Sequence, residues 1–199
     1  MNLKKILILP AGFLLSTITY IACCHCKPIN KHYLQALNLS VNPSGSNNTI
    51  VDNGTTVTMD SLYIDGSFGV GCIASHKDPF SFLVNTANAC SCEGCGYKGL
   101  KSKLNSLVIT SNNVFNGIPA GMSLNNYFKS YKREYYSNPA GLTIDSLKTL
   151  INEESYWSGD IKVYTKTKPA NNLNHQLTMT ATFANGTVLS AKTKDINWQ

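Results

Sequence analysis

The sequence has few charged residues and lacks an apolar run long enough to span a bilayer as a helix. Asp, Glu, Lys and Arg make up 14% of the 199 residues, and the net charge is +6. The basic residues are scattered, with one local group at Lys129, Lys132 and Arg133, whereas nucleic-acid binding needs a dense basic stripe. The apolar run 6–21 covers about 16 residues, and a spanning helix needs roughly 20. These absences argue against a nucleic-acid partner and disfavour a membrane-spanning helix.

Sequence signatures of catalysis are also lacking. The chain contains no Gly-x-Ser-x-Gly turn of the kind that exposes a nucleophilic serine. Cys92 and Cys95 have the spacing of a redox pair, but the residues after them, 97–99, do not form the helix pattern that activates such a thiol. We predict no catalytic residue and no cofactor, and hence a non-enzymatic binding or structural protein. The alternatives are a zinc- or copper-binding protein and a hydrolase or thiol-redox enzyme without a recognisable signature.

The first residues have the layout of an export signal. Lys4 and Lys5 precede the apolar run, which ends at the small residue Ala22 directly before Cys23. A basic start, an apolar centre and a small residue at the cleavage site define a secretory signal. A cysteine after the small residue is the lipidation site of bacterial lipoprotein signals. We therefore predict a lipoprotein signal peptide over 1–22, lipid on Cys23 and a tether over 23–32. A signal peptide without lipidation and a membrane anchor are the alternatives.

The remainder, 33–199, has the pattern of a β-rich domain. Asn, Thr and Ser are abundant, and such residues favour turns and strands over helix interiors. His175–Phe183 alternates apolar and polar residues and is followed by Asn185-Gly186 and a second run, 187–193. This pattern predicts a hairpin with a type I′ turn, in which both turn residues have positive φ. We predict an antiparallel β-sandwich with one short helix, Asp145–Glu154, capped by Thr143 or Asp145.

The other predicted elements are short and separated by turn-forming residues. A break in the alternation at Asp60-Ser61 indicates a bulge or two shorter strands. Residues 42–48 have the composition of a loop, and 124–136 fits a strand or a short helix. The remaining strand candidates are Tyr33–Val41, Thr55–Ile64, Phe68–Ala74, Phe80–Val84, Leu104–Thr110 and Asp160–Thr165.

Seven cysteines make disulfides the first expectation for an exported domain. If Cys23 carries lipid, the candidates for disulfide or metal bonding are Cys24, Cys26, Cys72, Cys90, Cys92 and Cys95. The simplest scheme joins the glycine-rich loop 90–95 to the core through Cys72, with a second bond from the tether to the loop. The alternative is a zinc or copper site on Cys90, Cys92 and Cys95, because thiolates suit these ions. Cys24, His25, Cys26 or His76 would complete that shell.

Other side chains that bear chemistry have structural interpretations. His175 stands at the start of a predicted strand, where a surface or capping position is expected rather than a catalytic base. Trp157 and Trp198 are able to stack on sugars, but core packing is the commoner fate of such rings.

With these residues in view, the chain resembles the uncharacterised lipoprotein families of Bacteroidetes. The resemblance rests on 23–26, on Leu107-Val108-Ile109-Thr110-Ser111 leading to Phe115-Asn116, on Pro119-Ala120-Gly121, on Leu124-Asn125-Asn126-Tyr127-Phe128, and on the closing hairpin 177–196. It implies a β-sandwich protein of the bacterial cell envelope, anchored by lipid to the outer membrane. The acidic run that often follows the lipidated cysteine in surface-exposed members is absent, so a periplasmic or a surface-exposed position is open. The partners expected are the membrane, through the lipid, and an envelope protein or a glycan.

Overall fold

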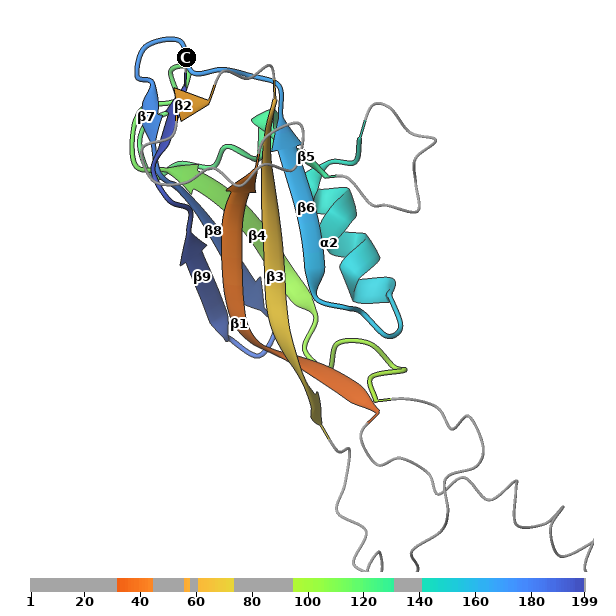
Figure 1. Ribbon diagram of the computed structural model, residues 1–199. Helices are drawn as coiled ribbons and strands as arrows, with labels where there is room; N and C mark the ends of the chain where they lie inside the picture. Colours follow the sequence, from red (N-terminus) through yellow and green to blue (C-terminus); the bar gives the residue numbers. More distant parts are fainter. Residues whose placement is uncertain (1–31, 45–55, 58–60, 74–94, 131–140, 199) are drawn as a thin grey trace, which may run out of the picture.

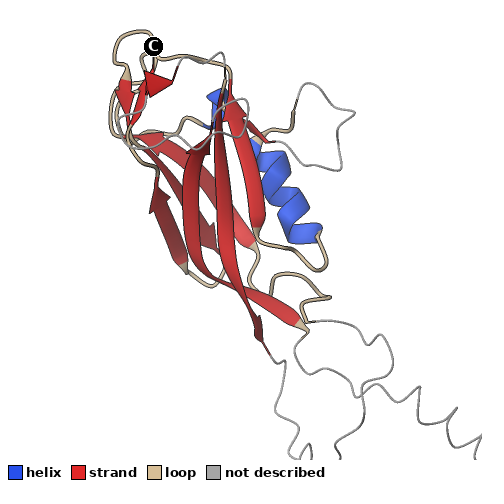
Figure 2. Ribbon diagram, viewed as in Figure 1, coloured by secondary structure: helices blue, strands red, loops and turns tan. Residues whose placement is uncertain are grey.

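The structure, a computed structural model, is an antiparallel β-sandwich with one α-helix, as the sequence predicts (Figure 2). It describes residues 32–44, 56–57, 61–73, 95–130 and 141–198. The strands are β1 (Tyr33–Ser44), β2 (Thr56–Val57), β3 (Leu62–Ile73), β4 (Leu104–Ser111), β5 (Lys129–Ser130), β6 (Asp160–Thr165), β7 (Asn174–His175), β8 (Leu177–Phe183), β9 (Val188–Lys192) and β10 (Ile196–Trp198). The helices are the 3₁₀ helix η1 (Asn125–Tyr127) and α2 (Ile144–Glu153).

Two larger sheets form the layers of the sandwich, and a small third sheet closes one end. The strand orders are β1-β3-β6-β5, β4-β8-β9 and β2-β10-β7, and the pairings are antiparallel apart from that of β2 with β10. In Figure 1, β1 begins at the lower end of the sandwich, whereas β7 and the C-terminus lie at the upper end. The two ends of the described domain are therefore far apart.

The core lies between the two larger sheets. Alternate residues of β8 are buried, as its alternating sequence requires. Phe68 of β3 meets Phe183 of β8 with ring centroids 6.1 Å apart, and it also packs on Trp157. Trp157 and Trp198 are both buried, which confirms core packing for these rings.

The closing hairpin forms as predicted, but its turn is of another type. β8 pairs with β9 in the register Thr182↔Val188. The N–H of Gly186 donates to the carbonyl of Phe183, and the N–H of Phe183 donates to that of Thr187. Only Gly186 of the turn residues has a positive φ, 84°. The predicted type I′ turn is therefore wrong, because the connection holds three residues, an arrangement that places one glycine in the left-handed region.

The predicted helix is confirmed within one residue at each end. α2 begins after Thr143, whose hydroxyl accepts a hydrogen bond from the N–H of Ser146 at 3.1 Å. Leu147 and Ile151 are buried, as their spacing on one face requires.

Two predictions about the first half of the domain are wrong in part. β3 begins directly after the predicted break at Asp60-Ser61, but it runs without interruption from Leu62 to Ile73 and so includes the strand predicted separately at Phe68–Ala74. Within it, Gly66 leaves room for the side chain of Ile161. β1 extends through Asn42 and Pro43, whose composition predicts a loop; a proline is tolerated there because β1 lies at a sheet edge. The segment 124–136 contains η1 and only two strand residues up to position 130, and the predicted strand Phe80–Val84 lies outside the described residues.

The free edge of β4 is closed by two asparagine side chains. Asn152 of α2 accepts from the N–H of Leu104 at 2.7 Å and donates to its carbonyl at 2.9 Å. Asn125 of η1 accepts from the N–H of Ile109 at 3.0 Å and donates to the carbonyl of Leu107 at 2.8 Å. Each amide thus pairs with β4 as a neighbouring strand would, and satisfies backbone groups that burial would otherwise leave unpaired.

Candidate functional site

A polar pocket lies at the end of the sandwich that carries β7 and the C-terminus. Its cavity has a volume of about 310 Å³. We call it the asparagine pocket, and its lining residues are Asn112, Asn113, Asn174, His175, Asp195 and Asn197. They come from the turn after β4, from β7, and from β10 with the residue before it. Three chain segments that are distant in the sequence therefore meet at this site.

His175 forms the buried floor of the asparagine pocket. Only 1% of the residue is exposed, so the expected surface or capping position is wrong. Its Nε2 lies 2.6 Å from the carbonyl oxygen of Asn172, and its Nδ1 lies 2.7 Å from the hydroxyl of Ser111. Because a carbonyl only accepts, Nε2 carries the proton and Nδ1 accepts from the Ser111 hydroxyl. Both nitrogens are paired in the neutral ring.

Burial lowers the pKa of His175 below its ordinary value of 6.5, and the bond to the Asn172 carbonyl only partly opposes this. The unfolded chain therefore binds a proton at a higher pH than the folded one. The free energy of unfolding is expected to fall as the pH drops below about 6.5, by at most about 1.4 kcal/mol per pH unit. Urea unfolding of the wild type and His175→Gln between pH 7.5 and 5.5 measures this, and an equal slope in both proteins would rule out His175 as its source.

Two of the pocket asparagines are held in place by the fold. Asn112 accepts from the N–H of Gln176 at 2.8 Å through its side-chain oxygen. Asn113 donates from its side chain to the carbonyl of Asn174 at 2.7 Å, and its backbone N–H donates to the Ser111 hydroxyl. The remaining amide nitrogen of Asn112 and the amide oxygen of Asn113 stay available. The pocket is thus largely preformed, which limits the entropy lost when a ligand binds.

The other side of the pocket carries polar side chains that do not take part in hydrogen bonds between the described segments. Within the part of the chain that the structure describes, the side chains of Asn174, Asp195 and Asn197 form no hydrogen bond or ion pair. Asn174 and Asp195 are exposed, and Asn197 is half-buried. Two exposed apolar side chains, Val114 and Leu173, are the sequence neighbours of Asn113 and Asn174. The pocket therefore offers amide donors and acceptors and a carboxylate, with apolar groups adjacent in the sequence.

The Ser111–His175 pair does not have the arrangement of a nucleophile and its base. Ser111 is 4% exposed, and its oxygen also accepts from the N–H of Asn113 at 3.2 Å. The second ring nitrogen meets a backbone carbonyl instead of a carboxylate. A nucleophile must reach a substrate, whereas this hydroxyl is enclosed. The pair is accordingly a structural link between β4 and β7.

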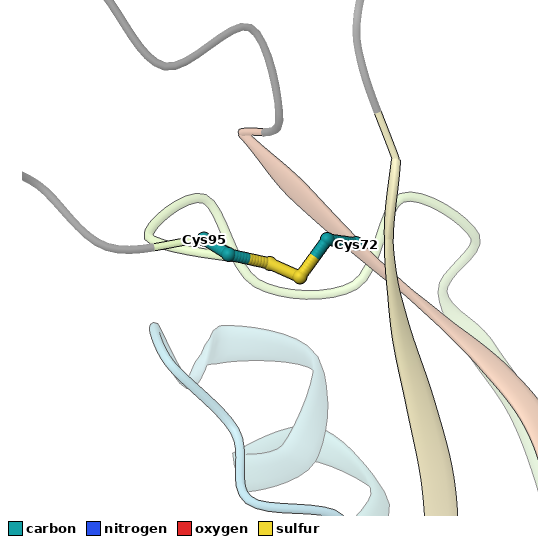
Figure 3. Close-up of a disulfide and its surroundings, with 2 residues drawn as sticks. All are labelled: Cys72 and Cys95. Atoms are coloured by element: carbon teal, nitrogen blue, oxygen red, sulfur yellow. A yellow bond between two sulfur atoms is a disulfide. The ribbon is translucent and has the colours of Figure 1, made fainter.

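One disulfide joins Cys72 of β3 to Cys95 on the turn before β4 (Figure 3), with Cα atoms 5.9 Å apart. This confirms the predicted connection between the cysteine-rich loop and the core through Cys72. Two backbone bonds of Leu34 fix the same segment to β1: its N–H donates to Gly99 and its carbonyl accepts from Lys101, each at 2.9 Å. The disulfide therefore lies at the end where β1 begins, away from the asparagine pocket.

The other predicted cysteine and histidine sites lie outside the described residues: Cys23, Cys24, His25, Cys26, His76, Cys90 and Cys92. In the described residues, no cluster of three His, Cys, Asp or Glu side chains has the arrangement of a metal site. The sulfur of Cys95 is bonded to Cys72, so it is not a thiolate ligand in this state. A zinc or copper site with Cys90 and Cys92 would need ligands other than Cys95 for as long as the disulfide persists.

None of the described helices is both long and apolar enough to cross a membrane.

No protein-family model and no curated protein matches this chain. Among solved structures, it is similar to the C-terminal domain of the AgI/II polypeptide BspA of Streptococcus agalactiae, with a TM-score of 0.31 and 13% identity. The similarity covers 80% of this chain and 49% of that chain, so this chain spans about half of that solved structure.

Proposed function

We propose that this chain is a lipoprotein of the bacterial cell envelope that acts as a non-enzymatic binding module. In this proposal, 1–22 directs export, Cys23 carries the lipid and 23–32 is the tether. One observation carries the proposal: β1 begins at the end of the domain opposite β7 (Figure 1), and residues of β7 line the asparagine pocket. A module built in this way holds the membrane with one end and presents its preformed pocket at the other.

Dimensions support this arrangement. The tether 23–32 reaches at most about 35 Å when fully extended. β1 has 12 residues and therefore runs for roughly 40 Å away from the tether. The pocket would thus lie beyond the lipid headgroups even when the tether is slack.

The disulfide supports an exported location. Disulfides persist in oxidising compartments and are rare where thiols are kept reduced. The Cys72–Cys95 bond closes the domain at the end that would face the membrane. In keeping with the resemblance to Bacteroidetes lipoproteins, we place the anchor in the outer membrane, with an envelope protein or a glycan as the partner. The enclosed Ser111 hydroxyl supports a binding role over hydrolysis.

Replacement of Cys23 tests the anchor. Cys23→Ala is expected to move the protein from the membrane fraction to the soluble fraction and to abolish labelling by radioactive palmitate, because lipid attaches to the thiol of the new N-terminus. The matched control is Cys24→Ala, which removes the adjacent thiol and should leave fractionation and labelling unchanged. A Cys23→Ala protein that is still labelled and still membrane-bound would refute the lipoprotein assignment.

A further inference from the structure

We propose that the asparagine pocket binds an uncharged carbohydrate segment. This inference rests on the proposed function, since it specifies the ligand of the binding module. The cavity of about 310 Å³ lies at the small end of the range for small-ligand sites. That size suits a short segment of a sugar chain, with the rest of the chain outside the pocket.

The polar groups of the pocket match sugar hydroxyls. A hydroxyl donates one hydrogen bond and accepts others, and a primary amide offers both functions in one plane. Asn174 and Asn197 present whole free amides, Asn112 presents its amide nitrogen, and Asp195 adds carboxylate oxygens that only accept. β10 pairs with β7 in the register Asn197↔Asn174, so these two amides stand on directly opposed residues. Such a paired set of donors and acceptors suits adjacent hydroxyls of one ring.

The charge of the pocket disfavours other ligands. Among the described residues, its lining contains one carboxylate and no Lys or Arg, so phosphate, nucleic acid and acidic sugars would meet repulsion without compensation from them. A single acid among amides is also too few charged ligands for a typical protein calcium site. Peptides are usually recognised along a sheet edge or in apolar pockets, and the lining here is polar. An uncharged, hydroxyl-rich ligand fits this chemistry best.

Two exposed apolar residues are adjacent in the sequence to lining residues of the pocket. Val114 is 49% exposed and Leu173 is 44% exposed. A sugar ring has C–H groups as well as hydroxyls, and burial of those groups against apolar side chains is favourable. The backbone of Leu173 is fixed, because its carbonyl accepts from the N–H of Trp198 at 2.8 Å. Polar and apolar groups thus occur together at one end of the domain.

Binding to a defined set of oligosaccharides tests the inference. The full chain, purified in detergent, is applied to immobilised neutral oligosaccharides of glucose, mannose, galactose and N-acetylglucosamine, and to sialylated and sulfated oligosaccharides and short peptides. We expect binding to a neutral member, measured next by isothermal titration. Asn197→Ala and Asp195→Asn should each raise its Kd about tenfold: the first removes a donor and an acceptor, and the second replaces a charged acceptor oxygen with a donor nitrogen. Asn126→Ala, an exposed asparagine on η1, is the matched control and should leave the Kd unchanged.

The possible outcomes separate the two proposals. Neutral binding that Asn197→Ala and Asp195→Asn leave unaltered, in variants that keep the wild-type melting temperature, would place the site elsewhere and overturn the inference. Absence of neutral binding overturns it as well. If a peptide or an acidic oligosaccharide binds instead and the pocket variants weaken that binding, the carbohydrate assignment fails while the binding module stands. If no member of the set binds in a way that depends on the pocket residues, the proposed binding function fails as well.

Discussion

Replacing Cys72 and Cys95 together by serine is expected to lower the free energy of unfolding by about 3 kcal/mol. The bond joins positions 23 residues apart, so its removal frees a long segment of the unfolded chain. It also releases the turn 95–101 from β3 and leaves that turn held to β1 by the backbone bonds of Leu34. Urea unfolding followed by tryptophan fluorescence measures the change, because Trp157 and Trp198 are both buried.

The single variant Cys72→Ser is the matched comparison for the double variant. Because the first substitution already removes the bond, the second should add little, and both proteins are expected to unfold at nearly the same urea concentration. Unfolding of the double variant at the wild-type midpoint would show that this bond does not stabilise the domain.

Removal of the asparagines that close the edge of β4 is the second large effect expected. Asn125→Ala and Asn152→Ala should each lower the free energy of unfolding by about 2–4 kcal/mol. Each change leaves one N–H and one carbonyl of β4 unpaired, in a strand where Leu104 is 1% exposed and Ile109 is fully buried. The desolvation cost of those groups, more than the lost side chain, sets the size of the effect.

A neighbouring residue provides the control for this prediction. Asn126 lies beside Asn125 on η1 but is exposed, and Asn126→Ala should change the stability by less than about 0.5 kcal/mol. Because Asn125 and Asn152 bind different parts of β4, the double variant should lose close to the sum of the two single losses. Equal stability of Asn152→Ala and Asn126→Ala would refute the edge-closing role.

Local patterns in the sequence are sufficient to predict the elements that depend on local preferences. β6 has the bounds Asp160–Thr165 that the sequence predicts, and β8 follows the alternation of its residues. α2 is predicted by its apolar spacing and by Thr143 at its start. In each case the regular spacing of apolar residues within one short segment predicts which face of the element is buried.

Elements that depend on distant partners are predicted less well. The sequence predicts separate strands on the two sides of Gly66, yet β3 continues through it, and Ile161 packs against the space that a side chain would fill. Asn125 and Asn152 look like ordinary turn or surface residues, and only the structure shows that both face β4. Their role depends on chain segments that meet only in the folded protein.

The sequence likewise predicts one part of the candidate site and not the other. The bond of Cys72 with the 90–95 loop is predictable, because cysteines of exported proteins tend to form disulfides and Cys72 is the cysteine within the predicted core. The asparagine pocket is not predictable, because its residues lie in three separate segments and each asparagine alone fits a turn. His175 also depends on a distant partner, Ser111, whereas its place at the start of a strand predicts only a surface or capping position.

The most direct test of the proposed binding site is an NMR titration of the ¹⁵N-labelled chain with the neutral oligosaccharide that binds best. We expect the side-chain amide signals of Asn112, Asn174 and Asn197 to shift together and to saturate, while the backbone signals of Tyr97 and Lys98, near the disulfide, stay in place. Shifts centred on Tyr97 and Lys98, with the pocket amides unmoved, would contradict the assignment of the binding site.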